Sequence, residues 1–372
     1  MSELLAAAAA VDDIVRANAD EAERIRRLPP ATVAALTNAG LMRMCVPAVY
    51  GGPEADPLTL VETIEAVSRA DGAAGWCTMI AATTSSMALF LPPETAKELF
   101  ADPTVVAGGV FAPNGVGTTD GDGFRVSGRW QWGSGTQHCQ WILGGTNCDD
   151  DTFRLCFFPA DDVTFYDTWH AAGLRGTGSL DFSVEGARVP ADRTIEPGIT
   201  PPTIDVPLAA FPNFALLAAG VAAVSIGIGR RALDEIVALA EGKRPQFSSR
   251  TLAQSGFTQA EVARAEARLR AGRALLLDEL GRTWDVACQG GRVDLSARVG
   301  IRLACVHAAA AAVAATDAAY TLAGGTSVYE SNSLQRCLRD VHVTTQHLMV
   351  APKLHETLGR LLLGLEADVR FL

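Results

Sequence analysis

Apolar residues in the first hundred positions recur with the spacing of α-helices. Val11, Ile14 and Val15 fall on one face of a helical segment, which ends at the two prolines at positions 29 and 30. The helices predicted in this region are Val11–Leu28, Ala31–Ala39, Leu58–Ser68 and Ala74–Leu91. The last of these is almost wholly apolar, so we expect it to be mostly buried.

From about residue 104 to residue 203, short alternating apolar runs are separated by glycine and aspartate. This alternation is typical of strands, and Asp120-Gly121-Asp122-Gly123 has the composition of a hairpin turn. The predicted strands include Phe124–Val126, Trp141–Leu143, Leu155–Phe158 and Asp181–Val184. No helices alternate with them and no G-x-G-x-x-G segment opens a helix, so the sequence predicts a β-barrel or β-sandwich and excludes a Rossmann domain.

After the prolines at 201, 202 and 207, helical spacing returns and continues to the end of the chain. The predicted long helices are Phe214–Glu241, Gln259–Val286, Leu295–Ala323 and Asp340–Val369. Four long helices imply a bundle, and the alanine-rich stretch Ala308–Ala315 predicts close helix contact. The sequence therefore predicts three domains: an N-terminal helical domain over 1–103, a central β domain over 104–204 and a C-terminal four-helix bundle over 205–372.

Composition narrows the classes of function. The 372 residues include 31 Lys and Arg against 42 Asp and Glu, a formal net charge of −11, which argues against a nucleic-acid binder. The most apolar stretch, Phe214–Gly229, is shorter than the roughly 18–20 residues of a membrane span, so we expect no membrane association. Eight cysteines without a C-x-x-C pair, and no basic export signal, predict reduced thiols in the cytoplasm. No His and Cys spacing fits zinc and Asp149–Asp151 is no calcium loop, so no metal is expected.

Short motifs in order along the chain resemble the acyl-CoA dehydrogenase superfamily. They are Leu36–Gly52, Gly128–Gly135, Gly173–Thr177 with Val189-Pro190, Arg244–Phe247, Gly324-Gly325 and Arg339-Asp340. The resemblance implies an acyl-CoA dehydrogenase-like fold of N-terminal helices, central β domain and four-helix bundle. It also implies a homotetramer, in which Arg244 reaches the cofactor phosphates of a neighbouring subunit.

One position departs from the dehydrogenase pattern. In common acyl-CoA dehydrogenases, a glutamate nine positions after the arginine of the Arg-Asp pair removes the substrate α-proton, and here that position is Leu348. Leucine cannot accept a proton, and Glu330 lies before Arg339-Asp340 rather than after it. The pattern favours the two-component flavin monooxygenases of the same fold. A flavin dehydrogenase with a displaced base is the alternative, and a catalytically silent subunit or scaffold is a third hypothesis.

The resemblance to those monooxygenases also implies a set of site residues. Such proteins take reduced FMN or FAD from a separate reductase, form a flavin C4a-hydroperoxide and hydroxylate small aromatic substrates, mostly phenolic or polyketide-like. The implied roles are substrate activation for His347, a wall of the substrate or flavin site for Trp76, and flavin binding for Trp132, Ser134, Arg244 and Phe247.

The residue types fit this chemistry, but each also has a purely structural interpretation. An imidazole with a pKa near about 6.5 can take a phenolic proton at neutral pH, yet on a helix His347 would lie in an apolar stripe with Val343 and Val350, as a core histidine does. Trp132-Gly133-Ser134 offers a flat wall and a hydroxyl, or forms only a turn. Arg244 can neutralise phosphates or simply end a helix in solvent. Ser179 is equally a loop residue.

Overall fold

The computed structural model describes residues 2–370 and 372, and the chain divides into two compact units. The first unit comprises Met1–Leu60, Trp76–Ala171 and Arg175–Ala210. The second comprises Val61–Gly75, Ala172–Leu174 and Phe211–Leu372. The predicted division at residues 103 and 204 stays a prediction, and the secondary structure changes class close to both positions.

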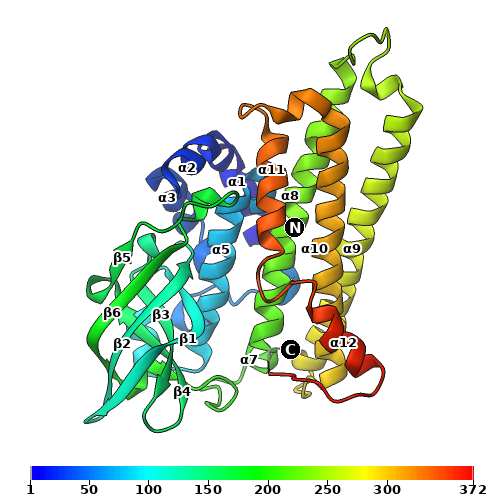
Figure 1. Ribbon diagram of the computed structural model, residues 1–372. Coiled ribbons are helices and arrows are strands. Elements are labelled where there is room, and N and C mark those ends of the chain that lie inside the picture. Colours follow the sequence, from blue (N-terminus) through cyan, green and yellow to red (C-terminus); the bar gives the residue numbers. More distant parts are fainter. Residues whose placement is uncertain (1, 371) are drawn as a thin grey trace. The chain divides into compact units, whose positions relative to one another are not determined.

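Short helices form the first hundred residues. They are α1 Glu3–Ala17, α2 Ala19–Ile25, α3 Pro30–Asn38, α4 Pro57–Ala70, α5 Gly72–Ser85 and α6 Pro93–Phe100 (Figure 1). The single helix predicted at Val11–Leu28 is wrong, because α1 begins near the N-terminus and ends at Asn18. The Asn18 amide nitrogen donates to the carbonyl oxygen of Ile14 at 2.8 Å, a local bond that competes with helix continuation.

The strands of the first unit form one seven-stranded sheet. They are β1 Ala107–Asp120, β2 Gly123–Gly133, β3 Trp141–Cys148, β4 Phe153–Pro159, β5 Thr164–Tyr166, β6 Leu180–Pro190 and β7 Thr194–Ile195. Their order is β5-β6-β2-β1-β3-β4-β7, with β1 and β3 parallel and every other pair antiparallel. The predicted hairpin turn is confirmed, since Asp120 pairs with Gly123 and Gly121 has φ +64°.

The core of the first unit joins the helices to the sheet. Phe100 at the end of α6 meets Phe157 of β4 edge to face, with ring centroids 6.2 Å apart. Met87, Leu99 and Leu143 are buried in the same cluster. Because burying one such side chain contributes roughly 1.5–3 kcal/mol, this cluster fixes β3 and β4 beneath the helices.

The second unit is a helical bundle. Its helices are α8 Asn213–Gly242, α9 Gly256–Cys288, α10 Leu295–Ala323, α11 Ser333–Thr344 and α12 Leu354–Leu362, and the short α7 Pro207–Ala210 precedes it in the chain (Figure 1). A Cβ atom on Gly229 would lie 3.1 Å from Cα of Ala312, and one on Gly272 would lie 3.1 Å from Cα of Ala308. The close contact predicted at Ala308–Ala315 is therefore confirmed. By length and composition α8 and α10 could cross a membrane, but most of each apolar stretch is buried in the protein.

The predicted fourth long helix, Asp340–Val369, is wrong. Helix α11 ends at Thr344, and α12 begins only at Leu354. The hydroxyl of Thr344 donates to the Val341 carbonyl oxygen at 2.7 Å, and Pro352 lacks the N–H that a continuing helix needs. His347 therefore lies in the turns between α11 and α12 and not on a helical stripe.

Candidate functional site

The end of strand β2 turns one tryptophan inward and another outward. Trp130 is fully buried and stacks on Phe182, with ring centroids 5.2 Å apart. The pairing of β2 with β6 then shifts between Trp130 and Gly133, as in a β-bulge. Trp132 within this shift has φ +65° and a side chain that is 67% exposed. A bulky residue in the left-handed region is a genuine outlier, and such strain concentrates at functional sites.

The bulge brings Ser134 into a buried hydrogen-bonded cluster. The indole Nε1–H of Trp76 donates to Ser134 Oγ at 3.0 Å. Ser134 Oγ lies 2.6 Å from Ser179 Oγ, which lies 2.7 Å from Thr177 Oγ1. The structure thus joins two predicted site residues, Trp76 and Ser134. It adds the hydroxyl of Thr177, which the sequence gave as the end of the Gly173–Thr177 motif, and that of Ser179, which it gave equally as a loop residue. The signal for them is the small polar run Thr177-Gly178-Ser179, which periodicity does not reveal.

Two glycines let the backbone pack closely around Ser134. A Cβ atom on Gly133 would lie 2.8 Å from the ring of Phe182. Gly135 has φ +68°, and a Cβ there would lie 3.1 Å from the ring of His138. Burial lowers the pKa of His138 to about 4, so this imidazole is neutral at neutral pH. His138 next to Cys139 has no second pair of ligands at zinc spacing, so the sequence assigned it no role, and its position beside this turn follows only from the fold.

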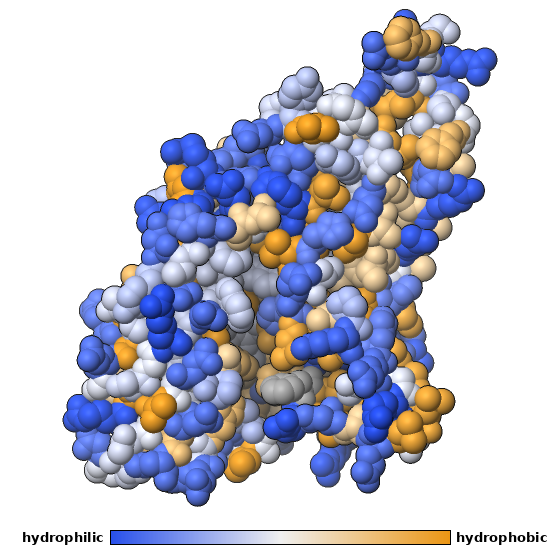
Figure 2. All heavy atoms as spheres, viewed as in Figure 1, coloured by the Kyte–Doolittle hydropathy of each residue, from blue (hydrophilic) through white to orange (hydrophobic). Residues whose placement is uncertain are grey.

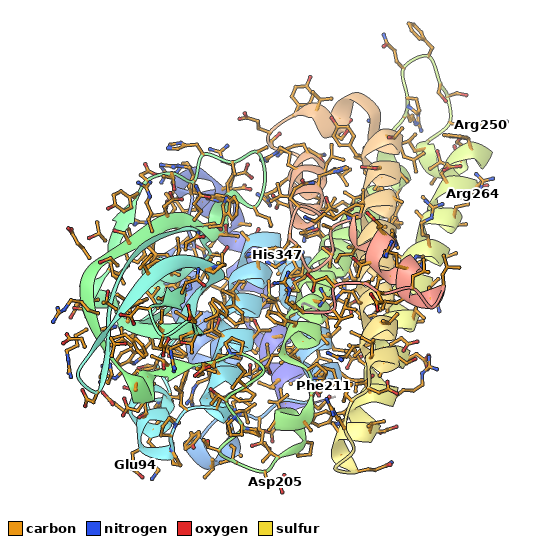
Figure 3. All side chains as sticks on the ribbon, turned by 60° about the horizontal axis from the view of Figure 1, so that its bottom comes forward. Glu94, Asp205, Phe211, Arg250, Arg264 and His347 are labelled. Carbon is orange, nitrogen blue, oxygen red and sulfur yellow. The ribbon has the colours of Figure 1, made fainter. Side chains whose placement is uncertain are left out.

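In the second unit, the ring of His347, which is labelled in Figure 3, contacts the main chain of the turn that follows it. The backbone N–H of Met349 donates to His347 Nδ1 at 3.3 Å. The guanidinium of Arg302, on α10, donates to the carbonyl oxygen of Met349 at 3.1 Å and to that of Phe214 at 3.4 Å. Arg302 is only 1% exposed, so a buried cation secures the turn that holds the imidazole.

The protonation state of His347 follows from this setting. Burial, and then the positive charge of Arg302, lower the pKa of His347 to about 4. The ring is therefore neutral at neutral pH. Since Nδ1 accepts from Met349, the hydrogen of the neutral ring lies on Nε2, which makes Nε2 a donor. The other nearby histidine, His342, lies 2.9 Å from Asp317 through Nε2.

Arg244 and Phe247 lie in the loop between α8 and α9. This loop projects past the end of the bundle, and Figure 2 shows apolar and polar residues together at its tip. Phe247 has φ +62° and is 100% exposed. Within the described part of the chain, Arg244 forms no hydrogen bond or ion pair, whereas Lys243 donates to Ala323 O and Thr326 Oγ1. The loop thus presents a cation and an aromatic ring to solvent.

The Gly173-Leu174 and Arg339-Asp340 motifs meet in the second unit. The backbone N–H of Leu174 donates to Asp340 Oδ1 at 2.5 Å, and Arg339 Nη1 donates to the carbonyl oxygen of Ala172 at 2.6 Å. A Cβ on Gly173 would lie 2.3 Å from the Arg339 carbonyl oxygen, so only glycine fits. These motifs therefore build structure rather than carry chemistry of their own.

Each unit, taken by itself, offers side chains of a kind that bind cofactors. The first unit has the exposed indole of Trp132 and the Ser134 hydroxyl, and the second has Arg244, without a hydrogen bond in the described residues, and the exposed ring of Phe247. No group of three or more His, Cys, Asp or Glu side chains in residues 2–370 and 372 has the arrangement of a metal site. An aromatic ring system suits the side chains of the first unit, and a phosphate group suits the arginine of the second.

Comparison with known proteins settles the family. The acyl-CoA dehydrogenase N-terminal domain family matches residues 4–96, and the acyl-CoA dehydrogenase C-terminal domain family matches residues 219–352. Indole-3-acetate monooxygenase from Pseudomonas putida is 33% identical over 355 residues, which cover 94% of this chain and 90% of that protein. This chain belongs to the acyl-CoA dehydrogenase superfamily. The predicted acyl-CoA dehydrogenase-like fold is confirmed.

Other similar proteins place this superfamily member among flavin-dependent oxidoreductases. The oxygenase subunit HsaA of a flavin-dependent monooxygenase from Rhodococcus jostii is 27% identical, covering 91% of this chain and 92% of that protein. XiaF from Streptomyces sp., solved in complex with FADH2 and glycerol, superposes with a TM-score of 0.94 at 26% identity, covering 100% and 97% of the two chains. Like these relatives, this acyl-CoA dehydrogenase superfamily member is a flavin-dependent oxidoreductase.

Proposed function

We propose that this protein is the oxygenase component of a two-component monooxygenase, which hydroxylates a small aromatic substrate with reduced flavin from a separate reductase. The main evidence for the proposal is Leu348, the residue that follows His347. Leu348 stands where common acyl-CoA dehydrogenases hold the glutamate that removes the substrate α-proton, and leucine cannot accept a proton. The names of the relatives, which are monooxygenases, support oxygenation in place of that reaction.

The reaction balances with three reactants. Molecular oxygen, a two-electron reduced flavin and an aromatic C–H give an aromatic C–OH, oxidised flavin and water. The flavin, when bound, supplies the electrons that activate oxygen. Ser134 would contribute a hydroxyl at the flavin ring and Trp132 a flat wall. Arg244 of a neighbouring subunit would contribute a positive charge for the phosphates, with Phe247 in the same loop.

His347 acts on the substrate as a hydrogen-bond donor. Because burial and the charge of Arg302 lower its pKa to about 4, the imidazole is a weak base at neutral pH, which favours hydrogen-bond donation over the proton-accepting role expected from the sequence. In this proposal its Nε2–H donates to an oxygen or nitrogen of the aromatic substrate. That bond strengthens as negative charge develops on the substrate, which makes the ring more reactive towards an electrophilic oxygen. Trp76, in the first unit, is proposed as an apolar wall of the substrate or flavin site.

Assembly into a homotetramer is part of the proposal. The exposed loop with Arg244 and Phe247, and exposed apolar side chains of α9 such as Phe257 and Leu275, support a surface that a second copy covers. Light scattering at micromolar concentration should give four times the chain mass. A monomeric mass would count against the tetramer and against the proposed contact of this loop with a neighbouring subunit.

A flavin titration followed by an oxygenation assay tests the function. FMN and FAD, each oxidised and each reduced without oxygen, are titrated into the protein, and we expect tighter binding of a reduced form. The complex is then mixed with ¹⁸O₂ and a panel of phenols together with indole-3-acetate. We expect one labelled oxygen atom in the product of at least one substrate.

The dehydrogenase alternative gives the opposite pattern. A protein that purifies with oxidised flavin, is bleached by an acyl-CoA and incorporates no ¹⁸O would contradict the monooxygenase. The Glu330→Gln variant then identifies the base, because only a displaced-base dehydrogenase would lose acyl-CoA-dependent bleaching when this exposed glutamate is neutralised. A silent scaffold would show neither activity and no flavin binding.

A further inference from the structure

We propose that Thr177 and Ser179 form, with Ser134, a reversible chain of hydroxyl groups that lets Ser134 either donate a hydrogen bond to its ligand or accept one from it. The inference rests on the proposed flavin site and deepens it. Thr177 and Ser179 are positioning residues, because they act on the cofactor only through Ser134.

The geometry of the chain supports direct hydroxyl-to-hydroxyl bonds. The Oγ atoms of Ser134 and Ser179 lie 2.6 Å apart, and Ser179 Oγ lies 2.7 Å from Thr177 Oγ1. Both distances are in the range of good O–H···O bonds. All three side chains are buried, so each hydroxyl depends on its protein neighbours for hydrogen bonding.

Counting donors and acceptors at Ser134 leaves two possible states. A serine hydroxyl has one O–H donor and two acceptor lone pairs. Trp76 Nε1–H can only donate, so it occupies one lone pair of Ser134 in every state. One O–H and one lone pair then remain, and Ser179 takes one of them. The other is left for a ligand.

The direction of the Ser134–Ser179 hydrogen bond therefore determines whether Ser134 offers the ligand a donor or an acceptor. If Ser179 donates to Ser134, the O–H of Ser134 is left to donate outward, and Thr177 must donate to Ser179. If Ser134 donates to Ser179, a lone pair of Ser134 is left to accept from the ligand, and the O–H of Ser179 turns to Thr177. The two states differ only in the rotation of hydroxyl hydrogens, with no change in the positions of heavier atoms.

A cofactor that is bound in both its oxidised and its reduced form needs Ser134 as a donor in one form and as an acceptor in the other. The ring atom N5 of a flavin accepts hydrogen bonds when the ring is oxidised and carries a hydrogen when the ring is reduced. An oxygenase component that takes up reduced flavin and releases it oxidised would need Ser134, where it meets this edge, first to accept a hydrogen bond and afterwards to donate one. A reversible hydroxyl chain meets this requirement without a conformational change.

The Thr177→Val variant allows hydrogen bonds in only one direction along the chain of hydroxyl groups. Without the threonine hydroxyl, the O–H of Ser179 keeps Ser134 as its partner, which fixes Ser134 as a donor. We expect reduced flavin to bind about 3- to 10-fold more weakly, the value of one hydrogen bond, while oxidised flavin binds as in the wild type. Thr177→Ser keeps the hydroxyl and should restore the wild-type ratio of the two dissociation constants. Ser179→Ala leaves Ser134 with both an O–H and a lone pair, so its ratio should also stay near the wild-type value.

The matched control is Thr136→Val. Thr136 is a buried threonine in the same turn, and its hydroxyl donates to the Gly133 carbonyl oxygen at 2.7 Å, outside the chain. The experiment measures dissociation constants for oxidised and anaerobically reduced FMN and FAD, together with thermal unfolding of each flavin-free variant. A structural effect lowers the melting temperature and weakens both redox forms equally.

The outcomes separate the two proposals. A selective loss of reduced-flavin binding in Thr177→Val, absent in Thr136→Val and rescued in Thr177→Ser, supports the hydroxyl chain. Equal weakening of both forms, or the same selective loss in Thr136→Val, overturns it while the proposed function stands. A wild-type protein that binds neither redox form contradicts the proposed function itself, and with it the ligand of the chain.

Discussion

Arg302 lies close enough to His347 that its charge, added to the larger effect of burial, lowers the pKa of that imidazole to about 4. The two residues are linked through Met349, which accepts from Arg302 with its carbonyl oxygen and donates to His347 with its N–H. One buried arginine on α10 thus both fixes the turn between α11 and α12 and adds to the effect of burial in lowering the pKa of the histidine in that turn.

Replacing Arg302 by methionine should raise the pKa of His347 while burial still holds it below about 6.5. In the wild type, the folded-state pKa lies below that of the unfolded chain. The stability that this difference contributes is present above pH 6.5 and is lost as the pH falls from about 6.5 towards 4. In Arg302→Met, the pH range over which this stability is lost should become narrower, because the folded-state pKa of His347 should lie closer to about 6.5.

An NMR titration of the His347 ring, assigned with a His347→Gln sample, checks this prediction. Arg230→Met is the control, since Arg230 pairs with Glu266 at 2.8 Å elsewhere in the bundle. Arg302→Lys keeps the charge and should keep the low pKa. An unchanged His347 pKa in Arg302→Met would show that burial alone sets it.

His347→Ala should uncouple flavin oxidation from hydroxylation. Loss of a donor that stabilises developing charge typically costs about 10²–10³ in rate, so the yield of hydroxylated product per reduced flavin should fall steeply while hydrogen peroxide is released. His347→Asn keeps an N–H donor and should recover part of the yield. His342→Ala, which removes only the contact with Asp317, should stay coupled. Wild-type yield in His347→Ala would make His347 a structural histidine.

Trp132→Gly should stabilise the fold and weaken flavin binding at the same time. Glycine adopts φ +65° without the strain that tryptophan carries there, which is worth about 1 kcal/mol in the free energy of unfolding, and the exposed indole contributes little burial. Urea unfolding of the flavin-free protein and a flavin titration measure the two effects. Trp132→Phe keeps both ring and strain and should resemble the wild type. A less stable Trp132→Gly protein would mean that the indole serves the fold.

Arg244→Ala should weaken binding of reduced flavin by about 1–3 kcal/mol, the range of a charge-assisted hydrogen bond to phosphate. The stability of the protein should not change, because the arginine makes no hydrogen bond or ion pair within the residues that the structure describes. Calorimetric titration at two salt concentrations measures the loss. Arg264→Ala, an exposed arginine of α9 paired with Glu261, is the control (Figure 3). Equal affinity in Arg244→Ala would assign the anchor to another residue of the loop, such as Arg250.

The sequence predicted the bounds of helices well where an apolar repeat extends over many residues. Helix α10 has the predicted bounds Leu295–Ala323, because glycine, proline or a capping residue marks each end of its apolar repeat. The last helix failed because the side chains of Thr344 and Thr345 bond back to the main chain, and hydropathy cannot register such bonds.

The candidate site was predicted only in part. Motifs identified Trp76 and Ser134, but their hydrogen bond joins residues 58 positions apart, and only the fold brings these together. Thr177 and Ser179 are small polar residues in a loop, with no periodicity to mark them. The low pKa of His347 results from burial and, to a smaller extent, from Arg302, and nothing in the sequence links these two residues. The flavin and substrate roles of Trp76, Trp132, Ser134, Arg244, Phe247 and His347 stay predictions.

The path of the chain also limits how parts of this protein can be exchanged with those of a relative. Each compact unit is assembled from three separate segments, and the short stretch Ala172–Leu174 leaves the first unit only to bind Asp340 in the second. No single cut yields either unit as one continuous polypeptide. Exchanging either complete unit with that of a relative would therefore require several junctions in the chain rather than one.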